Sequence, residues 1–172
     1  MCIRDSIFFT KSDDEGESWD SLTVLSLFDE DEENELDGTS YLLQQRVDVA
    51  ANENYVHVAW IDYDSYNGGY DIYYIKSNNN GNTWSEPSIV GTASSPGGTT
   101  IQSSGSNVVI AWVDFGDIYV VSSGTNGDSW GSEQLLEGLS SNLNYMPEMI
   151  YSEGKFHIVW SNTAFGLSLI HI

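Results

Sequence analysis

The sequence predicts an all-β fold that is built from one repeated unit. Three observations lead to this prediction: a short turn motif occurs three times, β-prone runs recur with it at similar spacing, and no stretch shows sustained helical periodicity with capping residues. The chain has 172 residues, 40% of them hydrophobic, which is enough material for the core of one domain.

The turn motif reads Ser-x-(Asp/Asn/Thr)-x-Gly-x-(Ser/Thr)-Trp and occupies residues 12–19, 77–84 and 123–130. Its Ser and Asp or Asn side chains can accept hydrogen bonds from backbone N–H groups inside a loop, and its Gly can adopt a positive φ. The Trp can anchor the next strand in a core. We therefore predict a hairpin turn, held more weakly in the third copy, where Thr125 replaces Asp or Asn. The residues given this structural role are Ser12, Asp14, Gly16, Trp19, Ser77, Asn79, Gly81, Thr83, Trp84, Ser123, Thr125, Gly127 and Trp130.

These three stretches resemble the Asp box of the BNR-repeat proteins, the family of sialidases (neuraminidases) and related β-propellers. In that family the box closes the hairpin between the third and fourth strands of a propeller blade. The resemblance covers nearly all of residues 7–166 and implies the same fold for this chain. It implies less about activity, because Asp boxes also occur in non-sialidase glycosidases, sorting receptors and assembly factors.

The spacing of the strands independently predicts propeller blades. A strongly β-prone run with a Trp recurs at residues 55–61, 108–113 and 156–160, and the three Trp positions lie 52 and 48 residues apart. A second run, Asp71–Ile75, recurs at residues 117–121, and each copy leads directly into a turn motif. A period near 50 residues with about four strands is typical of propellers. A β-sandwich is the alternative, although it would not need such regular repetition.

The length predicts an incomplete propeller of about three four-stranded antiparallel blades, with six or seven blades when complete. The chain begins at the third strand of one blade and stops after the second strand of another, so we expect exposed edges prone to aggregation. Residues 1–6 and 167–172 match no part of the repeat and are similar to translated sequencing-adaptor ends, so we set them aside as artefacts. Cys2 lies in the first of these ends, and residues 7–166 therefore offer no disulfide or redox site.

The charge balance restricts the partners. The chain carries 26 acidic and 5 basic residues, a net charge of −21, which argues against a nucleic-acid partner. No apolar run reaches the roughly 18 residues that suggest a membrane span. This composition suits an extracellular, secreted or cell-surface protein. Residues 29–37 hold seven carboxylates, which we interpret as a solvated loop, with a cation-collecting loop as the alternative.

The resemblance also indicates where a ligand would bind. In the sialidase family, ligands bind the face formed by the second-to-third-strand loops and the connections between blades. The segments expected on this face are 62–71, 114–117, 29–39, 91–99 and 161–166. The candidate ligand-face residues are Asp62, Tyr63, Asp64, Tyr66, Asn67, Asp71, Asp114 and Asp117.

The loop 62–71 supports three interpretations. Its alternating oxygen ligands followed by glycines suggest calcium, with Asp62, Asp64, Asn67 and Asp71 as ligands, but the third ligand of an EF-hand and its closing Glu are missing. A structured aromatic-rich loop is the second interpretation. Sugar contact through the tyrosines at positions 63, 66 and 70 is the third. We expect no other cofactor.

The sequence does not predict a complete active site. The resemblance implies three arginines, a Tyr–Glu nucleophile pair and an Asp acid/base for a sialidase, whereas residues 7–166 contain only Arg46. We therefore expect an inactive piece of a propeller that binds an extracellular glycan or protein ligand and is completed by its remaining blades. The first alternative is a part of an exo-α-sialidase-like glycoside hydrolase, and the second is a scaffold or adhesion module. His57 and His157 occupy equivalent strand positions, where we expect them to pack between blades.

Overall fold

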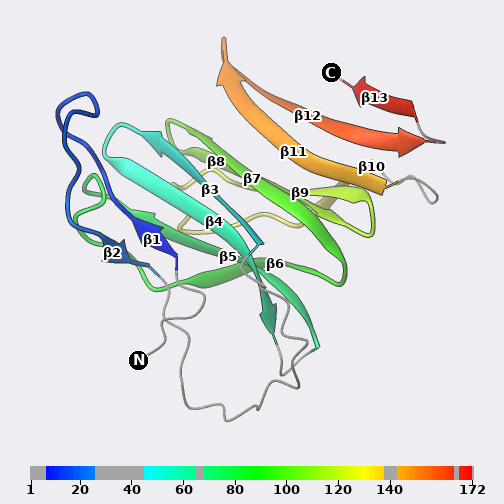
Figure 1. The fold of residues 1–172 in the computed structure, drawn as a ribbon, viewed down its shortest axis with the longest axis horizontal. Helices are drawn as coiled ribbons and strands as arrows, with labels where there is room; N and C mark the ends of the chain where they lie inside the picture. The colour runs from blue at the N-terminus through cyan, green and yellow to red at the C-terminus, as the bar shows by residue number, and fades with distance from the viewer. Residues whose placement is uncertain (1–6, 26–44, 65–67, 138–142, 165–166, 172) are drawn as a thin grey trace.

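The computed structural model describes residues 7–25, 45–64, 68–137, 143–164 and 167–171. All regular elements in these ranges are β-strands, and the strands pair in antiparallel fashion with their neighbours along the chain. The predicted all-β class is confirmed. Figure 1 shows the sheets following one another side by side, with β1 and β13 on opposite sides of the molecule. Within the described ranges there is no helix with the length and apolar character needed to cross a bilayer.

The strands in the described ranges form four sheets. Sheet I contains β1 (Phe8–Phe9) and β2 (Thr23–Val24). Sheet II has the order β3 (Gln45–Asn52), β4 (Tyr55–Asp64), β5 (Gly69–Ser77) and β6 (Ser88–Ala93). Sheet III repeats this order with β7 (Pro96–Ser104), β8 (Asn107–Asp114), β9 (Asp117–Ser123) and β10 (Gln134–Glu137). Sheet IV contains β11 (Leu143–Ser152), β12 (Lys155–Ala164) and β13 (Leu167–His171).

The repeated unit is visible in sheets II and III, which have the same four-strand order. The second and third turn motifs connect the third and fourth strands of these sheets, and the first motif connects β1 to β2. The turn motifs lie at the same end of the sheets as the hairpins that join first to second strands, because Asn80 N donates to Asn54 O at 2.8 Å and Asn126 N to Ser106 O at 2.8 Å. The opposite end carries the connections between sheets.

Several strand boundaries differ from the sequence expectation. Residues 167–172 were set aside, yet Leu167–His171 pairs with β12 from Ala164 to Trp160. An open strand edge accepts any extended segment, and the apolar run in this tail is β-prone, so the pairing does not bear on the origin of the tail. After the first turn motif, where a fourth strand is expected, the described residues 20–25 form a strand at Thr23–Val24 alone, and much of segments 91–99 and 161–164 is strand rather than loop. The acidic segment lies outside the described residues.

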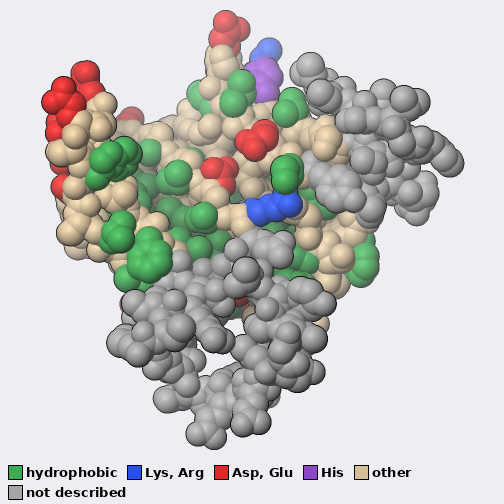
Figure 2. Space-filling model, in the orientation of Figure 1, with side chains coloured by type: hydrophobic (Ala, Val, Ile, Leu, Met, Phe, Trp, Pro, Cys, Tyr) green, Lys and Arg blue, Asp and Glu red, His purple; other side chains and the backbone are tan. Residues whose placement is uncertain are grey.

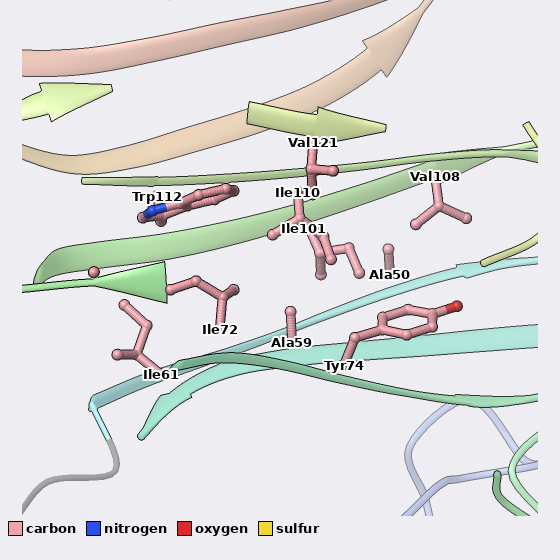
Figure 3. Packing of buried hydrophobic residues seen from close by; sticks show 11 residues of the cluster. Ala50, Ala59, Ile61, Ile72, Tyr74, Ile101, Val108, Ile110, Trp112 and Val121 are labelled. Atoms are coloured by element: carbon pink, nitrogen blue, oxygen red, sulfur yellow. The ribbon is translucent and has the colours of Figure 1, made fainter. Parts of the chain in front are cut away.

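The main core lies between sheets II and III. Figure 3 shows side chains from one sheet pointing toward side chains of the other, with Trp112 at one end and Tyr74 at the other. A second cluster joins Ile7 and Leu25 of the first segment to Val58 and Trp60 of sheet II. Both faces of sheet II are therefore covered, which explains its consecutive apolar residues. Each fully buried aliphatic side chain contributes about 1.5–3 kcal/mol.

Candidate functional site

The turn motifs share one hydrogen-bond pattern. Ser12, Ser77 and Ser123 each accept the N–H of the Gly four positions later, at Oγ···N distances of 2.8, 2.8 and 2.9 Å. The residue before each Gly also has a positive φ, between 54° and 59°. These bonds satisfy backbone donors inside the loop without a strand partner. The motif therefore fixes its own turn.

The third position of the motif closes the second half of the turn. Asp14, Asn79 and Thr125 each accept the N–H of the residue four positions later, at 2.8, 2.9 and 3.0 Å. Thr125 thus keeps the bond, although one hydroxyl offers fewer acceptor sites than a carboxylate or amide. Hydrogen bonds from Ser18 hold the pKa of the exposed Asp14 at about 2.

The Trp of the motif connects neighbouring sheets. Trp84 packs edge-on against Phe9, with ring centroids 4.9 Å apart, and Trp130 packs in the same way against Tyr74 at 4.8 Å. The motif Gly faces the same ring, because a Cβ on Gly127 would lie 2.0 Å from the Tyr74 hydroxyl oxygen. Each of these two turns therefore receives an aromatic side chain from the preceding sheet.

A buried polar cluster lies beside the third turn. His57 is fully buried, and its Nδ1 lies 2.7 Å from the Tyr74 hydroxyl. Burial, with a smaller effect of Lys76, lowers the pKa of His57 to about 4. Lys76 Nζ donates to Asn126 O at 2.9 Å and pairs with Asp128. His57 therefore packs between sheets as expected, whereas its counterpart His157 is exposed because no described segment covers that face of sheet IV.

The inner strands form a groove at the opposite end of the sheets. The first strands β3, β7 and β11 each contain a β-bulge near their start. Two bulge residues, Arg46 (φ 72°) and Met146 (φ 48°), adopt the left-handed conformation, which is uncommon outside Gly. A groove of about 290 Å³ crosses the bulges, lined by Arg46, Val47, Asp48, Gly98, Thr99, Met146, Pro147 and Glu148.

The charged residues of the groove have different roles. Asp48 Oδ2 accepts hydrogen bonds from Thr100 Oγ1 at 2.8 Å and Ile101 N at 2.9 Å, so this carboxylate joins sheet II to sheet III. Arg46 is exposed, and its guanidinium lies over Gly98, where a Cβ would meet Nη1 at 2.9 Å. Glu148 is exposed on β11, on the far side of β7 from Arg46. Figure 2 shows how few basic side chains this view of the molecule carries.

Two strand hairpins extend from the same end of the sheets as the groove. The first is the β4–β5 hairpin. Gln45, at the start of β3, pairs with Ile61 of β4, and the pairing of β4 with β5 continues beyond Ile61. Asp62 and Asp71 are cross-strand partners and both are buried, and Asp62 Oδ1 accepts from Tyr63 N at 2.8 Å. Tyr63 contacts Tyr70 with ring centroids 5.1 Å apart.

The calcium prediction is only partly open to inspection. The side chain of Asp64 and all of Tyr66 and Asn67 lie outside the described residues. Among the side chains that are described, no cluster of three or more His, Cys, Asp or Glu residues suits a metal ion. Asp62 and Asp71 are brought together, and the calcium site stays a prediction.

The second hairpin places an aromatic ring at its tip. Asp114 and Asp117 pair across a two-residue turn formed by Phe115 (φ 50°) and Gly116 (φ 86°), and Phe115 is 68% exposed. Asp114 Oδ1 accepts from two consecutive backbone N–H groups, of residues 94 and 95, at 2.9 and 2.8 Å. Asp114 therefore holds the connection between sheets II and III. Phe115 lies within the predicted ligand-face segment 114–117 but was not among the candidate residues, although two aspartates around an x-Gly pair are a hairpin signal.

No protein-family model and no curated protein sequence matches the chain. A solved structure, a point mutant of the NanB sialidase from Streptococcus pneumoniae, matches with a TM-score of 0.60 and 14% sequence identity, over 94% of this chain and 24% of that chain. The chain has a sialidase-like β fold. At this identity the likeness concerns the fold alone, and the chain spans about a quarter of the length of that sialidase. The sialidase-like fold contains the groove and the turn motifs described above.

Proposed function

We propose that the chain is part of a secreted Asp-box β-propeller whose inner-strand groove binds an extracellular glycan. The observation that carries this proposal is the groove itself, which crosses three consecutive first strands and holds Arg46 at its surface. Ligands of concave folds bind where several elements converge and a few polar groups fix their orientation.

The propeller assignment is supported by the repetition of sheets II and III. Each unit has four antiparallel strands, and the polypeptide passes from the fourth strand of one sheet to the first strand of the next. Such sheets in a radial series, with six or seven in the complete ring, would place all first strands around a central axis. The groove would then open at one end of that axis.

The chemistry of the groove fits an acidic sugar. The planar guanidinium of Arg46 can hold a carboxylate through two parallel hydrogen bonds. Exposed aromatic rings at the same end, those of Phe115 and Tyr63, offer apolar faces for sugar rings. The similarity of the fold to a sialidase supports a sialic-acid-containing glycan in particular.

Calorimetric titration of the full chain with 3′-sialyllactose tests the proposal, with lactose as the neutral comparison. We expect binding of sialyllactose only, with a Kd below about 1 mM, equivalent to roughly −4 kcal/mol. Arg46→Ala should weaken this binding at least 10-fold. Lys155→Ala removes an exposed positive charge at the opposite end of the sheets and should leave the affinity unchanged.

Equal affinities for both sugars, or equal losses in the two variants, would contradict a carboxylate site at Arg46. The exo-glycosidase alternative is tested by release of free sialic acid from the same sugar. Among the described groove residues, the Asp48 carboxylate already accepts hydrogen bonds from Thr100 Oγ1 and Ile101 N. We therefore do not propose it as a catalytic acid.

A further inference from the structure

The interface between sheets II and III changes character along its length. Its middle is filled by an apolar cluster. At the turn-motif end, Figure 3 shows the Tyr74 hydroxyl pointing out of this cluster, on the side opposite Trp112. Beyond the hydroxyl, the interface receives four polar side chains, which belong to Asn52, His57, Ser103 and Asn126.

Two of these side chains come from sheet II. Asn52 pairs with Tyr55, and His57 pairs with Ala50. Residues at alternate positions of a strand share a face, so Asn52 points the same way as Ala50, which packs in the cluster between the sheets. The ring of His57 reaches the same space, because its Nδ1 lies 2.7 Å from the Tyr74 hydroxyl.

The other two side chains come from sheet III. Ser103 lies two positions after Ile101, which packs in the same cluster, so both side chains face sheet II. Asn126 belongs to the third turn motif, and its carbonyl oxygen accepts a hydrogen bond from the Tyr74 hydroxyl at 3.4 Å. The Tyr74 hydroxyl therefore contacts both His57 and Asn126.

The first strands bring Asn52 and Ser103 to the same level. β3 and β7 both run from the groove toward the turn-motif end. Asp48 Oδ2 of β3 accepts hydrogen bonds from Thr100 Oγ1 and Ile101 N of β7, which fixes an offset of 52 to 53 residues between the strands. Strands that run in the same direction rise equally per residue, so Asn52 lies beside the segment that follows Ser103.

Each of the four side chains has a buried polar atom that no described residue satisfies. These atoms are both amide atoms of Asn52, Nε2 of His57, Oγ of Ser103 and Oδ1 of Asn126. His57 is fully buried, and Ser103 is 5% exposed. A buried polar atom without a partner is strongly unfavourable, and such atoms are few in a folded domain. Their concentration at one end of one interface indicates a ligand that bonds with them.

The chemistry of the cluster selects this ligand. Asn52 Nδ2 can only donate, Asn126 Oδ1 can only accept, and the Ser103 hydroxyl can do both. A cation would need acceptors alone, and it would be repelled by Lys76, whose Nζ lies 2.9 Å from Asn126 O. An anion would need donors alone. Burial, with a smaller effect of Lys76, also lowers the pKa of His57, as expected where positive charge is disfavoured.

We propose that ordered internal water binds between sheets II and III, held by Asn52, His57, Ser103 and Asn126. A mixed set of neutral donors and acceptors suits water, which forms about three hydrogen bonds at a typical buried site. The water connects the first strands of both sheets to the third turn motif. The groove lies at the opposite end of the sheets, so the proposal does not depend on a glycan ligand.

A high-resolution crystal structure of the full chain tests the proposal directly. We expect density for at least one water molecule within about 2.7–3.2 Å of two or more of the four side chains. Direct hydrogen bonds among these side chains, with no water between them, would overturn the proposal. So would a density peak with the shorter, oxygen-only contacts of a metal ion.

Thermal unfolding of Ser103→Ala gives a second test, because the sign of the effect depends on the water. With bound water, the substitution removes a satisfied hydroxyl and leaves the water short of one partner, so the Tm should fall by about 2–4 °C. Without the water, removal of an unpartnered hydroxyl should leave the Tm unchanged or raise it, and this result would contradict the proposal. The control Ser104→Ala alters a partly exposed position on the other face of β7 and should change the Tm by less than about 1 °C.

Discussion

Among single residues, His57 provides the clearest link between burial and pH. Its neutral ring is fully buried, and its pKa is lowered to about 4 from the usual 6.5. His57 binds a proton more readily in the unfolded chain than in the folded one. The contribution of the neutral, buried ring to the free energy of unfolding is therefore complete above pH 6.5 and is lost as the pH falls to about 4.

We therefore expect the free energy of unfolding to fall between pH 7 and pH 4 by about 2 kcal/mol more in the wild type than in His57→Val. The substitution copies Val109, which holds the equivalent position in sheet III. Urea unfolding at several pH values measures both slopes. If the free energy of unfolding falls equally with pH in both proteins, His57 is not the cause of the pH dependence.

Gly127 should be far less replaceable than Gly105, although both have a positive φ. A Cβ on Gly127 would overlap the Tyr74 ring, whereas nothing lies within 4 Å of a Cβ on Gly105. Gly105→Ala should cost about 1 kcal/mol through backbone strain alone. Gly127→Ala should cost about 3 kcal/mol or more, since Tyr74 must move from its site. Thermal unfolding of the two variants tests this, and equal losses would contradict the packing explanation.

The predictability of individual residues depended on how local their partners are. The motif residues could be predicted because Ser77 bonds with Gly81 only four positions away. Arg46 and Met146 could not be placed in one groove, because their proximity depends on the register of strands about 100 residues apart. Asp114 was expected on the ligand face, yet its partners in the connection between sheets were not evident from the sequence.

At the level of elements, the turn motif should stabilise the strand pair that it joins. Ser77 is 1% exposed and its Oγ accepts from the N–H groups of Asn79 and Gly81. Ser77→Ala leaves both donors without this acceptor and should destabilise the protein by about 1–3 kcal/mol. Ser106→Ala, at an exposed position of another turn, is the matched control and should change stability by less than about 0.5 kcal/mol.

Hydrogen exchange should localise the effect of Ser77→Ala to β5 and β6. Faster exchange that is confined to sheet III, or spread evenly over the described strands, would contradict a local role for the motif.

The strands were predictable where the repeat constrained them. The β-prone runs around Trp60 and Trp112 became β4 and β8, since both combine β-branched residues with an aromatic anchor. The pairing of Leu167–His171 was missed because it depends on an open edge, not on a repeat. A fourth strand was expected after the first turn motif, and the structure has it at Thr23–Val24, shorter than expected within the described residues.

For the whole molecule, charge is the dominant variable. A net charge of −21 on 172 residues disfavours any compact state through self-repulsion, and 0.1 M salt largely screens the repulsion between exposed charges more than about 10 Å apart. We expect the Tm of the chain to rise by several degrees between 0.02 and 0.3 M NaCl, because screening weakens this repulsion. Differential scanning calorimetry measures the shift, and a Tm that falls with salt would show that attractive ion pairs outweigh the repulsion.

The interlocking of Gly, Trp and the aromatic ring of the preceding sheet connects nearest neighbours only. Because Phe9 meets Trp84 as Tyr74 meets Trp130, the boundary between sheets I and II and the boundary between sheets II and III follow one rule. Duplication of a whole stretch from Gln45 to Ala93 within the gene would therefore bring its own matching surfaces on both sides. Such an architecture can lengthen by tandem copying during evolution, without compensating substitutions at distant positions.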